Sequence, residues 1–455
     1  MKSFKIVTLG CRVNQCESES LAVALREGGW WPAPETWPAS LCIINTCTVT
    51  GKASMQSRQA VRQAVRANPG ACVVVTGCYA QTEAEVLARI DGVDLIVGHG
   101  EKHRVLPLVE AHLAAVGADD GSVLLPEAGS GPPKVHRSDV MHAREFRRIS
   151  AAPSGRRARP SLKIQDGCDA FCTYCIVPYA RGRSRSMPVD EVMASIQQLH
   201  DSGFREVVLS GIHLGCYGRD LSPPTDLASL LRRIDDEARI GRVRLSSIEP
   251  LELTEEIIEL VAASGRFCPH FHVPLQSGDN GVLARMHRPY TREGFAAVVL
   301  KIADQMPRAT IGADVLVGFP GESEAAFQNS LDMVRDLPIC YLHVFPFSPR
   351  TGTPAAGYPD PVPVDVIKER CRRLRSLGTA KRKAFYNGAL GRCVEVLVEN
   401  ERDSETGLLK GVSSEYLTVL LEGGDALKND FVTVAVERVW SGRLAFGRRA
   451  DASPA

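Results

Sequence analysis

Short β-rich runs alternate with helical stretches in two long series along this chain of 455 residues. In the first series the strand-like runs are 4–10, 41–46, 72–77 and 93–98, and helical patterns occupy 18–29 and 54–68. Such alternation is typical of a parallel sheet that is covered by helices on both faces. We therefore predict an α/β multidomain protein whose residues 1–116 form a doubly wound parallel α/β domain.

The second series covers residues 161–386 and contains six strand-like runs, each followed by a helical stretch. Six consecutive β/α units predict a partial (β/α)6 barrel, in which the chemistry lies at the carboxyl ends of the strands. Polar residues or glycines stand at those ends in this sequence, namely Gly167, Gly211, Glu249, Gln276, Gly318 and Ser348.

The remaining segments have different compositions. Residues 117–160 are rich in Gly, Pro, Ser and Arg, which is typical of a linker. Residues 387–450 hold five short strand-like runs with turn residues between them, which predicts a small antiparallel β-barrel. We expect residues 451–455 to be a tail.

The chain has 14 cysteines, and their meaning depends on where the protein resides. No apolar run approaches the roughly 20 residues that span a bilayer, and residues 1–11 lack a signal-peptide pattern. We therefore expect a cytoplasmic protein with no membrane partner, whose clustered cysteines indicate metal binding or catalysis before disulfides. Cys42, Cys72, Cys340 and Cys371 lie in apolar or helical surroundings and are read as small hydrophobic residues.

Three of the strand-like runs in the first series lead directly into a cysteine: Cys11, Cys47 and Cys78. In a parallel sheet the carboxyl ends of the strands share one edge, where ligands bind. The three sulfurs are therefore candidates for the ligands of one metal site. Cys16 lies only five positions after Cys11, but it falls in the following helical segment and is the weaker candidate.

A second group, Cys168, Cys172 and Cys175, has the spacing C-x3-C-x2-C after the first run of the six-unit series. A structural zinc site usually has a fourth ligand and paired C-x2-C units. A thioredoxin-like interpretation of "CTYC" leaves Cys168 unused. Three thiolates on one loop suit a [4Fe–4S] cluster in which one iron stays open to another ligand.

Charge gives weaker indications of a partner, because the net charge is only +1. Basic residues concentrate at 144–185 and 368–383, where they either contact phosphate or form solvated surfaces. Residues 387–455 hold an excess of acidic residues, which does not favour RNA binding by the small barrel as a whole. Arg181, Arg183 and Arg185 alternate, so in an extended strand they would point one way, toward phosphate or a substrate carboxylate.

These motifs resemble a known family. C-x3-C-x2-C at the start of six β/α units is similar to the radical S-adenosylmethionine (SAM) superfamily. With "LGCRVNQCE", "INTCTVT" and "TGCYAQ" the chain resembles the methylthiotransferases, and "PYARGRSRS", "LSSIEP", "HVPLQSGDN", "RPYTRE" and "GFPGESE" resemble that family too. The terminal barrel is similar to its TRAM domain. "TLGCRVNQ", "NTCTVT" and "SGIHLGCYGRD" are most similar to the subgroup that acts on threonylcarbamoyladenosine.

The resemblance implies two [4Fe–4S] clusters, one on Cys168, Cys172 and Cys175, which cleaves SAM, and one on Cys11, Cys47 and Cys78. It also implies contacts to SAM from the barrel, with Gly211 near the methionyl end. The implied cofactor-binding residues are Tyr174, Gly211, Ser246, Gln276, Asp314, Val317 and Phe345. Most of these positions are equally consistent with barrel-core or turn structure.

The implied activity is the addition of a methylthio group to C2 of N6-threonylcarbamoyladenosine 37 in tRNA. A SAM-derived radical would abstract the C2 hydrogen, and the second cluster would carry the sulfur. The implied partners are the anticodon stem–loop and a low-potential donor such as flavodoxin or ferredoxin. The alternatives are the same chemistry on isopentenyladenosine 37 or on a ribosomal-protein aspartate, and a non-catalytic metal-stabilised RNA-binding protein.

Overall fold

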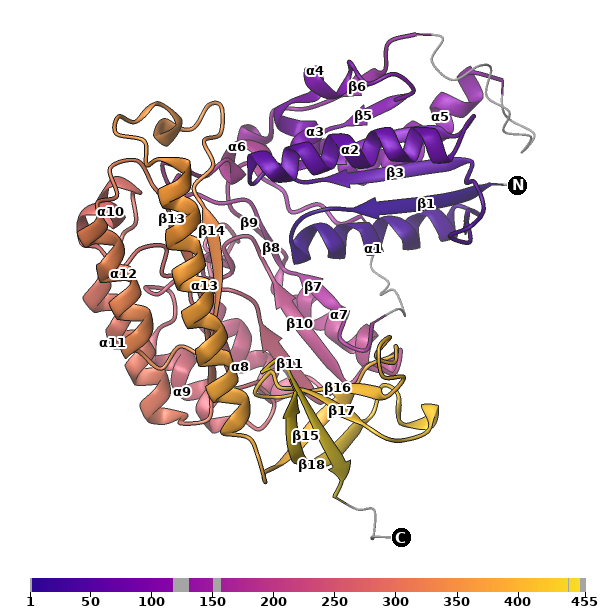
Figure 1. Ribbon diagram of the computed structural model, residues 1–455. Helices are drawn as coiled ribbons and strands as arrows, with labels where there is room; N and C mark the ends of the chain where they lie inside the picture. The colour runs from indigo at the N-terminus through magenta and orange to yellow at the C-terminus, as the bar shows by residue number, and fades with distance from the viewer. Residues whose placement is uncertain (1, 118–130, 150–156, 441, 451–455) are drawn as a thin grey trace. The chain divides into compact units, whose positions relative to one another are not determined.

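The computed structural model describes every residue of the chain except 1, 118–130, 150–156, 441 and 451–455. The chain forms two compact units (Figure 1). The first comprises Met1–Ser154, Gln165–Ser186 and Ser348–Ala356, and the second comprises Gly155–Ile164, Met187–Phe347 and Gly357–Ala455. Each unit has a hydrophobic core of its own.

A parallel six-stranded sheet with the order β2-β1-β3-β4-β5-β6 forms the centre of the first unit. Its strands are β1 (Ser3–Thr8), β2 (Trp31–Pro32), β3 (Leu41–Thr46), β4 (Cys72–Gly77), β5 (Leu95–Val97) and β6 (Lys134–His136). Its helices are α1 (Arg12–Glu27), α2 (Gly51–Ala67), α3 (Cys78–Thr82), α4 (Ala84–Leu87) and α5 (Val105–Ala115). The order makes β1, β3 and β4 neighbours, so their carboxyl ends meet at one edge.

Successive side chains of the central strands pack on opposite faces of this sheet, as the period of a strand requires. Ile44 of β3 packs in a core cluster with Val61 of α2, whereas the preceding Ile43 packs in another cluster with Leu21 of α1. Figure 1 shows α1 and α2 on the two sides of the sheet. Because both faces are buried, β3 and β4 read as continuous apolar runs in the sequence.

The first unit also contains the loop that carries the second cysteine group. In this region β8 (Gln165–Asp166) and β9 (Arg185–Ser186) pair in antiparallel fashion, and α6 (Val177–Arg181) lies between them. Two short 3-10 helices, η1 (His99–Arg104) and η2 (Val140–His142), complete the unit. The first strand-like run of the second series is divided in the structure, since β7 (Ser161–Lys163) belongs to the second unit and β8 to the first.

The second unit contains two parallel three-stranded sheets, β11-β10-β7 and β12-β13-β14. The further strands are β10 (Glu206–Ser210), β11 (Arg242–Leu245), β12 (His270–His272), β13 (Thr310–Val317) and β14 (Tyr341–Pro346). The helices are α7 (Val189–Asp201), α8 (Leu227–Glu237), α9 (Glu255–Ala263), α10 (Asn280–Arg285), α11 (Arg292–Gln305), α12 (Glu324–Asp336) and α13 (Val364–Asn387), with 3-10 turns η3 (Leu214–Cys216) and η4 (Pro354–Gly357) in the chain between them.

A closed five-stranded barrel follows α13, with the order β15-β16-β17-β19-β18. Its elements are β15 (Cys393–Val398), β16 (Leu409–Ser413), β17 (Thr418–Leu421), η5 (Asp425–Leu427), β18 (Phe431–Trp440) and β19 (Leu444–Arg449). Its pairs are antiparallel apart from the parallel pair β17–β19. Alternate apolar side chains fill its interior, among them Val396, Val419 and Val434, each fully buried.

Buried arginines attach the barrel to the sheet of β10 and β11. Arg244 donates hydrogen bonds to the carbonyl oxygens of Ser413 (2.9 Å) and Ser414 (3.0 Å), and Arg242 donates to that of Val412 (2.9 Å). Both guanidinium groups also pair with Glu206, at 2.7 Å from Arg242 and 3.0 Å from Arg244. These charge-assisted bonds fix the barrel against the strands.

The predicted fold class is confirmed: a doubly wound parallel domain, a partial (β/α)6 arrangement and a small barrel. Within the predicted linker, β6 adds to the edge of the six-stranded sheet, so the described part of that segment also contributes to the fold. No helix among the described residues is long and apolar enough to cross a membrane.

Candidate metal centres

The first cysteine group lies at one edge of the six-stranded sheet. Cys11 follows β1 and precedes α1, Cys47 comes directly after β3, and Cys78 begins α3 directly after β4. Strand register aligns the three ends, because Thr8 pairs with Asn45 and Thr46 pairs with Gly77. The structure thus brings the three predicted ligands to the same edge. Cys16 lies inside α1, as its sequence position indicates.

Two glycines allow the loops of this edge to approach closely. Gly10 has φ +101°, and a Cβ atom there would lie 2.8 Å from the Cβ of Cys47 and 2.9 Å from its sulfur. Gly77 has φ +100°, and a Cβ atom there would lie 2.5 Å from the carbonyl oxygen of Thr46. Only glycine fits either position, which explains why the sequence has glycine before Cys11 and Cys78.

Burial and neighbouring charge determine the state of these thiols. Cys47 and Cys78 are 6% and 5% exposed, whereas Cys11 is exposed. Burial, reinforced by the neighbouring thiol of Cys78, raises the pKa of Cys47 to about 11. Burial also raises the pKa of Cys78, while the positive charges of Arg181 and Lys102 lower it. A cation bound to sulfur would favour the thiolates. The donor set of three soft sulfurs beside a buried arginine therefore fits an iron–sulfur cluster.

Arg181 is the centre of a buried ion network beside this edge. It is 1% exposed, and its guanidinium donates to Glu17 Oε1 at 2.9 Å, Asp166 Oδ1 at 2.8 Å and Asn14 Oδ1 at 2.6 Å. Lys102 pairs with the other oxygen of Glu17, and His99 Nε2 lies 3.0 Å from Asp166 Oδ2. The network joins α1, which follows Cys11, to Asp166, which stands two residues before Cys168.

The network also holds the loops of the first cysteine group. The side-chain amide of Asn14 donates to the carbonyl oxygens of Leu9 (2.8 Å) and Thr46 (3.1 Å), immediately before the Gly10–Cys11 turn and Cys47. Arg181 binds the opposite end of the same amide. One buried arginine thereby positions backbone near two of the candidate ligands and near the second cysteine loop.

The prediction that Arg181, Arg183 and Arg185 point one way is therefore wrong. Arg181 ends helix α6 rather than lying in a strand, and it is buried. Arg185 is also buried and donates to the carbonyl oxygens of Arg181 and Arg183. Arg183 alone is exposed, where it pairs with Asp169 at 3.2 Å. The first and last of the three hold the fold of the loop and are not available to tRNA phosphate.

The second cysteine group lies in the loop between β8 and α6. Gly167 precedes it with φ +75°, and a Cβ atom there would lie 1.9 Å from the carbonyl oxygen of Arg183. Cys168 N donates to the carbonyl oxygen of Gly182 at 3.0 Å, and Cys175 N donates to that of Cys172 at 2.9 Å. The amide of Ala170 lies 3.4 Å from the sulfur of Cys168. A loop held at both ends, with an amide directed at sulfur, suits a thiolate-bound cluster.

The predicted SAM-site residues divide between the units, with Tyr174 in the first and the others in the second. Gly211 and Ser246 directly follow β10 and β11, and Gln276 lies beyond β12 with φ +62°. Asp314 and Val317 belong to β13, and Phe345 belongs to β14, where it is 41% exposed. These positions stand on the strands or at their carboxyl ends, as the sequence predicts.

Among the described residues, two hydroxyl groups at these strand ends have no hydrogen-bond partner. They are the buried Oγ atoms of Ser210, the last residue of β10, and Ser246, the first residue after β11. An unsatisfied buried hydroxyl costs free energy unless a ligand supplies the bond. Both positions therefore fit a polar cofactor such as SAM. Sequence analysis did not identify Ser210, although it stands directly before Gly211.

Asp314 has partners that sequence analysis also missed. Its Oδ1 lies 3.2 Å from His272 Nε2 and 3.1 Å from His343 Nδ1. Burial alone would raise the pKa of Asp314, but hydrogen bonds from His272 and His343 lower it to about 2. The carboxylate is therefore held ionised at the centre of the β12-β13-β14 sheet. The signal for this group was the presence of histidines inside two otherwise apolar strands.

Comparison with known proteins identifies the family. Residues 3–98 match the family described as "Uncharacterized protein family UPF0004", and residues 162–334 match the radical SAM superfamily. The chain is 37% identical to the threonylcarbamoyladenosine tRNA methylthiotransferase MtaB of Bacillus subtilis, over 94% of this chain and 92% of that protein. The MtaB of Aquifex aeolicus is 38% identical over 91% of this chain and 96% of its own length.

Relatives named for another substrate are nearly as similar. The tRNA-2-methylthio-N(6)-dimethylallyladenosine synthase of Pelotomaculum thermopropionicum is 34% identical over 96% of this chain and 95% of that protein. Among solved structures, the radical SAM methyltransferase TsrM of Kitasatospora setae shares the fold, with a TM-score of 0.53 and 18% identity over 78% of this chain and 75% of that chain. A radical SAM domain implies SAM and a [4Fe–4S] cluster as cofactors. The chain belongs to the radical SAM methylthiotransferase family of enzymes.

Proposed function

We propose that this enzyme adds a methylthio group to C2 of N6-threonylcarbamoyladenosine 37 in tRNA. The observation that carries the proposal is the presence of two separate cysteine groups, one at the sheet edge and one on the β8–α6 loop, within a single compact unit. A methylthio transfer to an unactivated carbon needs both a radical source and a sulfur source. Two thiolate-bound centres provide for both.

In this proposal Cys168, Cys172 and Cys175 hold the cluster that binds SAM. Cys11, Cys47 and Cys78 hold a second [4Fe–4S] cluster. When bound, one SAM and the cluster on the β8–α6 loop would supply the radical that abstracts the C2 hydrogen, a second SAM would supply the methyl group, and the other cluster would supply the sulfur. The protein's own contribution is to hold the ligands in place. The buried network of Arg181, with the turns at Gly10 and Gly77, performs that task at the first cysteine group.

The carboxyl ends of the second unit's strands are proposed to bind SAM. Ser210 and Ser246 offer hydroxyl groups that have no partner among the described residues. Gly211, which has no side chain, would let the backbone approach a ligand. Tyr174, Gln276, Asp314, Val317 and Phe345 are the other proposed contacts. The ionised carboxylate of Asp314 is an acceptor for hydroxyl or ammonium groups.

The substrate assignment depends on similarity along the whole chain. Identity to relatives named as threonylcarbamoyladenosine methylthiotransferases is 35–38%, compared with 32–36% for those named as dimethylallyladenosine synthases. That margin favours threonylcarbamoyladenosine and keeps isopentenyladenosine 37 as the second candidate. The reaction also needs a low-potential electron donor such as flavodoxin or ferredoxin.

Mass spectrometry of tRNA nucleosides tests the proposal. A strain without the gene is complemented with the wild-type chain, with Cys11→Ala, with Cys175→Ala, or with Cys16→Ala as the matched control. We expect 2-methylthio-threonylcarbamoyladenosine only with the wild type and Cys16→Ala, and the unmethylthiolated nucleoside in the other strains. Restoration of the isopentenyl product instead would show that isopentenyladenosine 37 is the substrate. An unchanged nucleoside profile after deletion of the gene would refute a tRNA substrate.

A further inference from the structure

Helix α2 presents a surface of cations and amides with no carboxylate. Its 17 residues include Lys52, Arg58, Arg62 and Arg66 and no Asp or Glu. The side toward the sheet is buried at Ser54, Ser57, Val61 and Ala64. On the opposite side an exposed stripe follows the helical period, and the exposed Met55 lies within it. Its polar members are Lys52, Gln56, Gln59, Arg62, Gln63 and Arg66. We call these six residues the α2 stripe.

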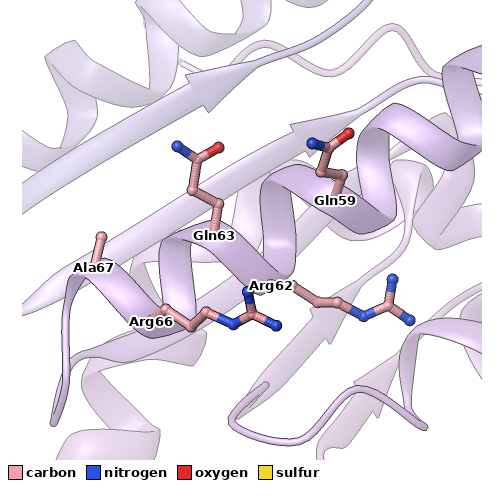
Figure 2. A pocket seen from close by; sticks show the side chains of 5 residues that line it. All are labelled: Gln59, Arg62, Gln63, Arg66 and Ala67. Carbon is pink, nitrogen blue, oxygen red and sulfur yellow. The ribbon is translucent and has the colours of Figure 1, made fainter.

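The carboxyl-terminal half of the stripe forms a shallow hollow. Its volume is about 510 Å³, and Gln59, Arg62, Gln63, Arg66 and Ala67 line it. Figure 2 shows the two arginine side chains extending in the same direction from the helix, with the two glutamine side chains together on the adjoining side. Residues four apart are neighbours on a helix, so the two guanidinium groups and the two amides form adjacent pairs of donors.

Arg62 and Arg66 lack the acidic partners that many other exposed arginines of the described residues have. In the described part of the chain neither has an ion pair, whereas Arg233 of α8 pairs with Glu237. Half of the eight cations in the basic stretch 368–383 are neutralised by intramolecular pairs: Lys368–Asp365, Arg370–Glu322, Arg372–Glu369 and Arg373–Glu324. Both surfaces keep uncompensated positive charge, but α2, unlike α13, carries no carboxylate of its own.

We propose that the α2 stripe binds the sugar–phosphate backbone of the substrate tRNA. Arginine forks grip phosphate oxygens in a bidentate manner, and glutamine amides bond to phosphate and ribose oxygens. The stripe has no acidic group, so its charge favours a polyanion over a protein partner of mixed charge. Such contacts orient the RNA and do not read its sequence. This inference rests on the proposed tRNA substrate and adds the surface that holds it.

The position of the stripe along α2 agrees with this assignment. The helix begins four residues after Cys47, and Thr50 caps its first turn by accepting a hydrogen bond from Ala53 N at 3.1 Å. At a rise of about 1.5 Å per residue, Arg62 and Arg66 lie roughly 20 Å along the helix from that end. If the reacting base lies beside the first cysteine group, the stripe would therefore contact the RNA backbone at nucleotides well away from the modified one.

The salt dependence of RNA binding tests the proposal. The reconstituted holoenzyme is titrated with a synthetic anticodon stem–loop that carries threonylcarbamoyladenosine, in 50–200 mM KCl, for the wild type and for Arg62→Gln/Arg66→Gln. The matched control is Arg232→Gln/Arg233→Gln on α8, which removes the same charge from arginines that pair with Glu256 and Glu237. Each lost phosphate contact lowers the slope of log K against log salt by about 0.7–0.9.

We therefore expect the magnitude of that slope to be smaller by about 1.4–1.8 in the double α2 variant than in the wild type. Across this fourfold range of salt, the wild type should lose about tenfold more affinity than the variant. The α8 control should match the wild type. An α2 variant whose slope equals that of the wild type overturns the proposal. The proposal is also overturned if the α2 variant turns over more slowly with flavodoxin as the electron donor but normally with dithionite. That result would show that the stripe binds an acidic protein rather than RNA.

Failure of the proposed function would give a different result. In that case the wild type itself would produce no methylthiolated nucleoside from this RNA, whatever the slopes. The stripe variants leave the cysteine groups and the Arg181 network intact, so iron content equal to that of the wild type verifies that a change in slope reflects RNA contact.

Discussion

Replacing Arg181 by methionine keeps most of the side-chain volume and removes one buried positive charge. Three acceptors lose their bonds to the guanidinium: Glu17, Asp166 and Asn14. Glu17 keeps Lys102 as a partner, and Asp166 keeps the amide of Gly167 at 2.9 Å, His99 at 3.0 Å and Arg185 at 4.0 Å. The substitution therefore leaves a carboxylate that is 4% exposed with weakened compensation.

The expected cost follows from that burial. Removing one partner of a buried ion pair destabilises a protein by about 3–5 kcal/mol, because the remaining charge has no solvent to replace the partner. The same substitution at Arg183 removes an exposed pair with Asp169, which contributes about 0–1 kcal/mol. The two arginines are two residues apart, so the contrast isolates the effect of burial.

Urea unfolding followed by tryptophan fluorescence measures the difference. Three of the four tryptophans, Trp30, Trp31 and Trp37, lie in the first unit, so the signal reports mainly on that unit. We expect Arg181→Met to lower the midpoint by roughly 1–2 M and Arg183→Met to leave it almost unchanged. Equal midpoints for the two variants would refute the role given to Arg181. If Arg181→Lys has the same midpoint as the wild type, the positive charge at this position, rather than the several hydrogen bonds of the guanidinium, accounts for the stability.

Three further predictions concern burial, backbone conformation and pH. Glu206→Gln leaves two buried arginines without their carboxylate and should lower the free energy of unfolding by about 3–5 kcal/mol. Chemical unfolding followed by the fluorescence of Trp440 in the barrel measures the loss, and an unchanged value would contradict the structure. Gly77→Ala meets a carbonyl oxygen 2.5 Å away at φ +100°, so we expect about 1–3 kcal/mol of strain and a lower iron content, measured by unfolding and metal analysis. Burial and the charge of Arg181 lower the pKa of His99 to about 4, so the unfolded chain binds more protons between pH 6.5 and 4, and stability falls as pH falls through that window. The loss attributable to His99 is about 1 kcal/mol between pH 7 and 5.5, and a His99→Gln variant with an unchanged pH slope would refute it.

The sheet edge was predictable from sequence because it depends on local patterns. Apolar runs of strand length identify β3 and β4, glycine marks turns of positive φ, and parallel strands end at one edge. The cysteines then follow by position alone. The C-terminal barrel was predictable for the same reason, since its five strands alternate apolar and polar residues between evident turns.

The polar network was not predictable in this way. Arg181 contacts Glu17 across 164 positions of sequence, and no local pattern distinguishes a buried arginine from an exposed one. A local signal for α6 did exist, since Pro178 stands in its first turn and Gly182 ends it with φ +80°. With that signal, the alternation of the three arginines would not have been read as an extended strand.

The distribution of surface charge could also not be predicted from the sequence alone. The count of basic residues at 368–383 is high, but acidic residues on α12 and α13 neutralise part of it. Helix α2 has fewer cations, but it contains no acidic residue of its own. The partners of a charge, rather than the number of charges, determine which surface attracts RNA.

Iron and sulfide content after anaerobic reconstitution tests the central claim most directly. The wild type is compared with two variants, one with alanine at Cys11, Cys47 and Cys78 and the other with alanine at Cys168, Cys172 and Cys175. We predict about eight irons and eight sulfides for the wild type and about four of each for either variant. About four irons in the wild type, or zinc in place of iron, would contradict the assignment of one cluster to each cysteine group.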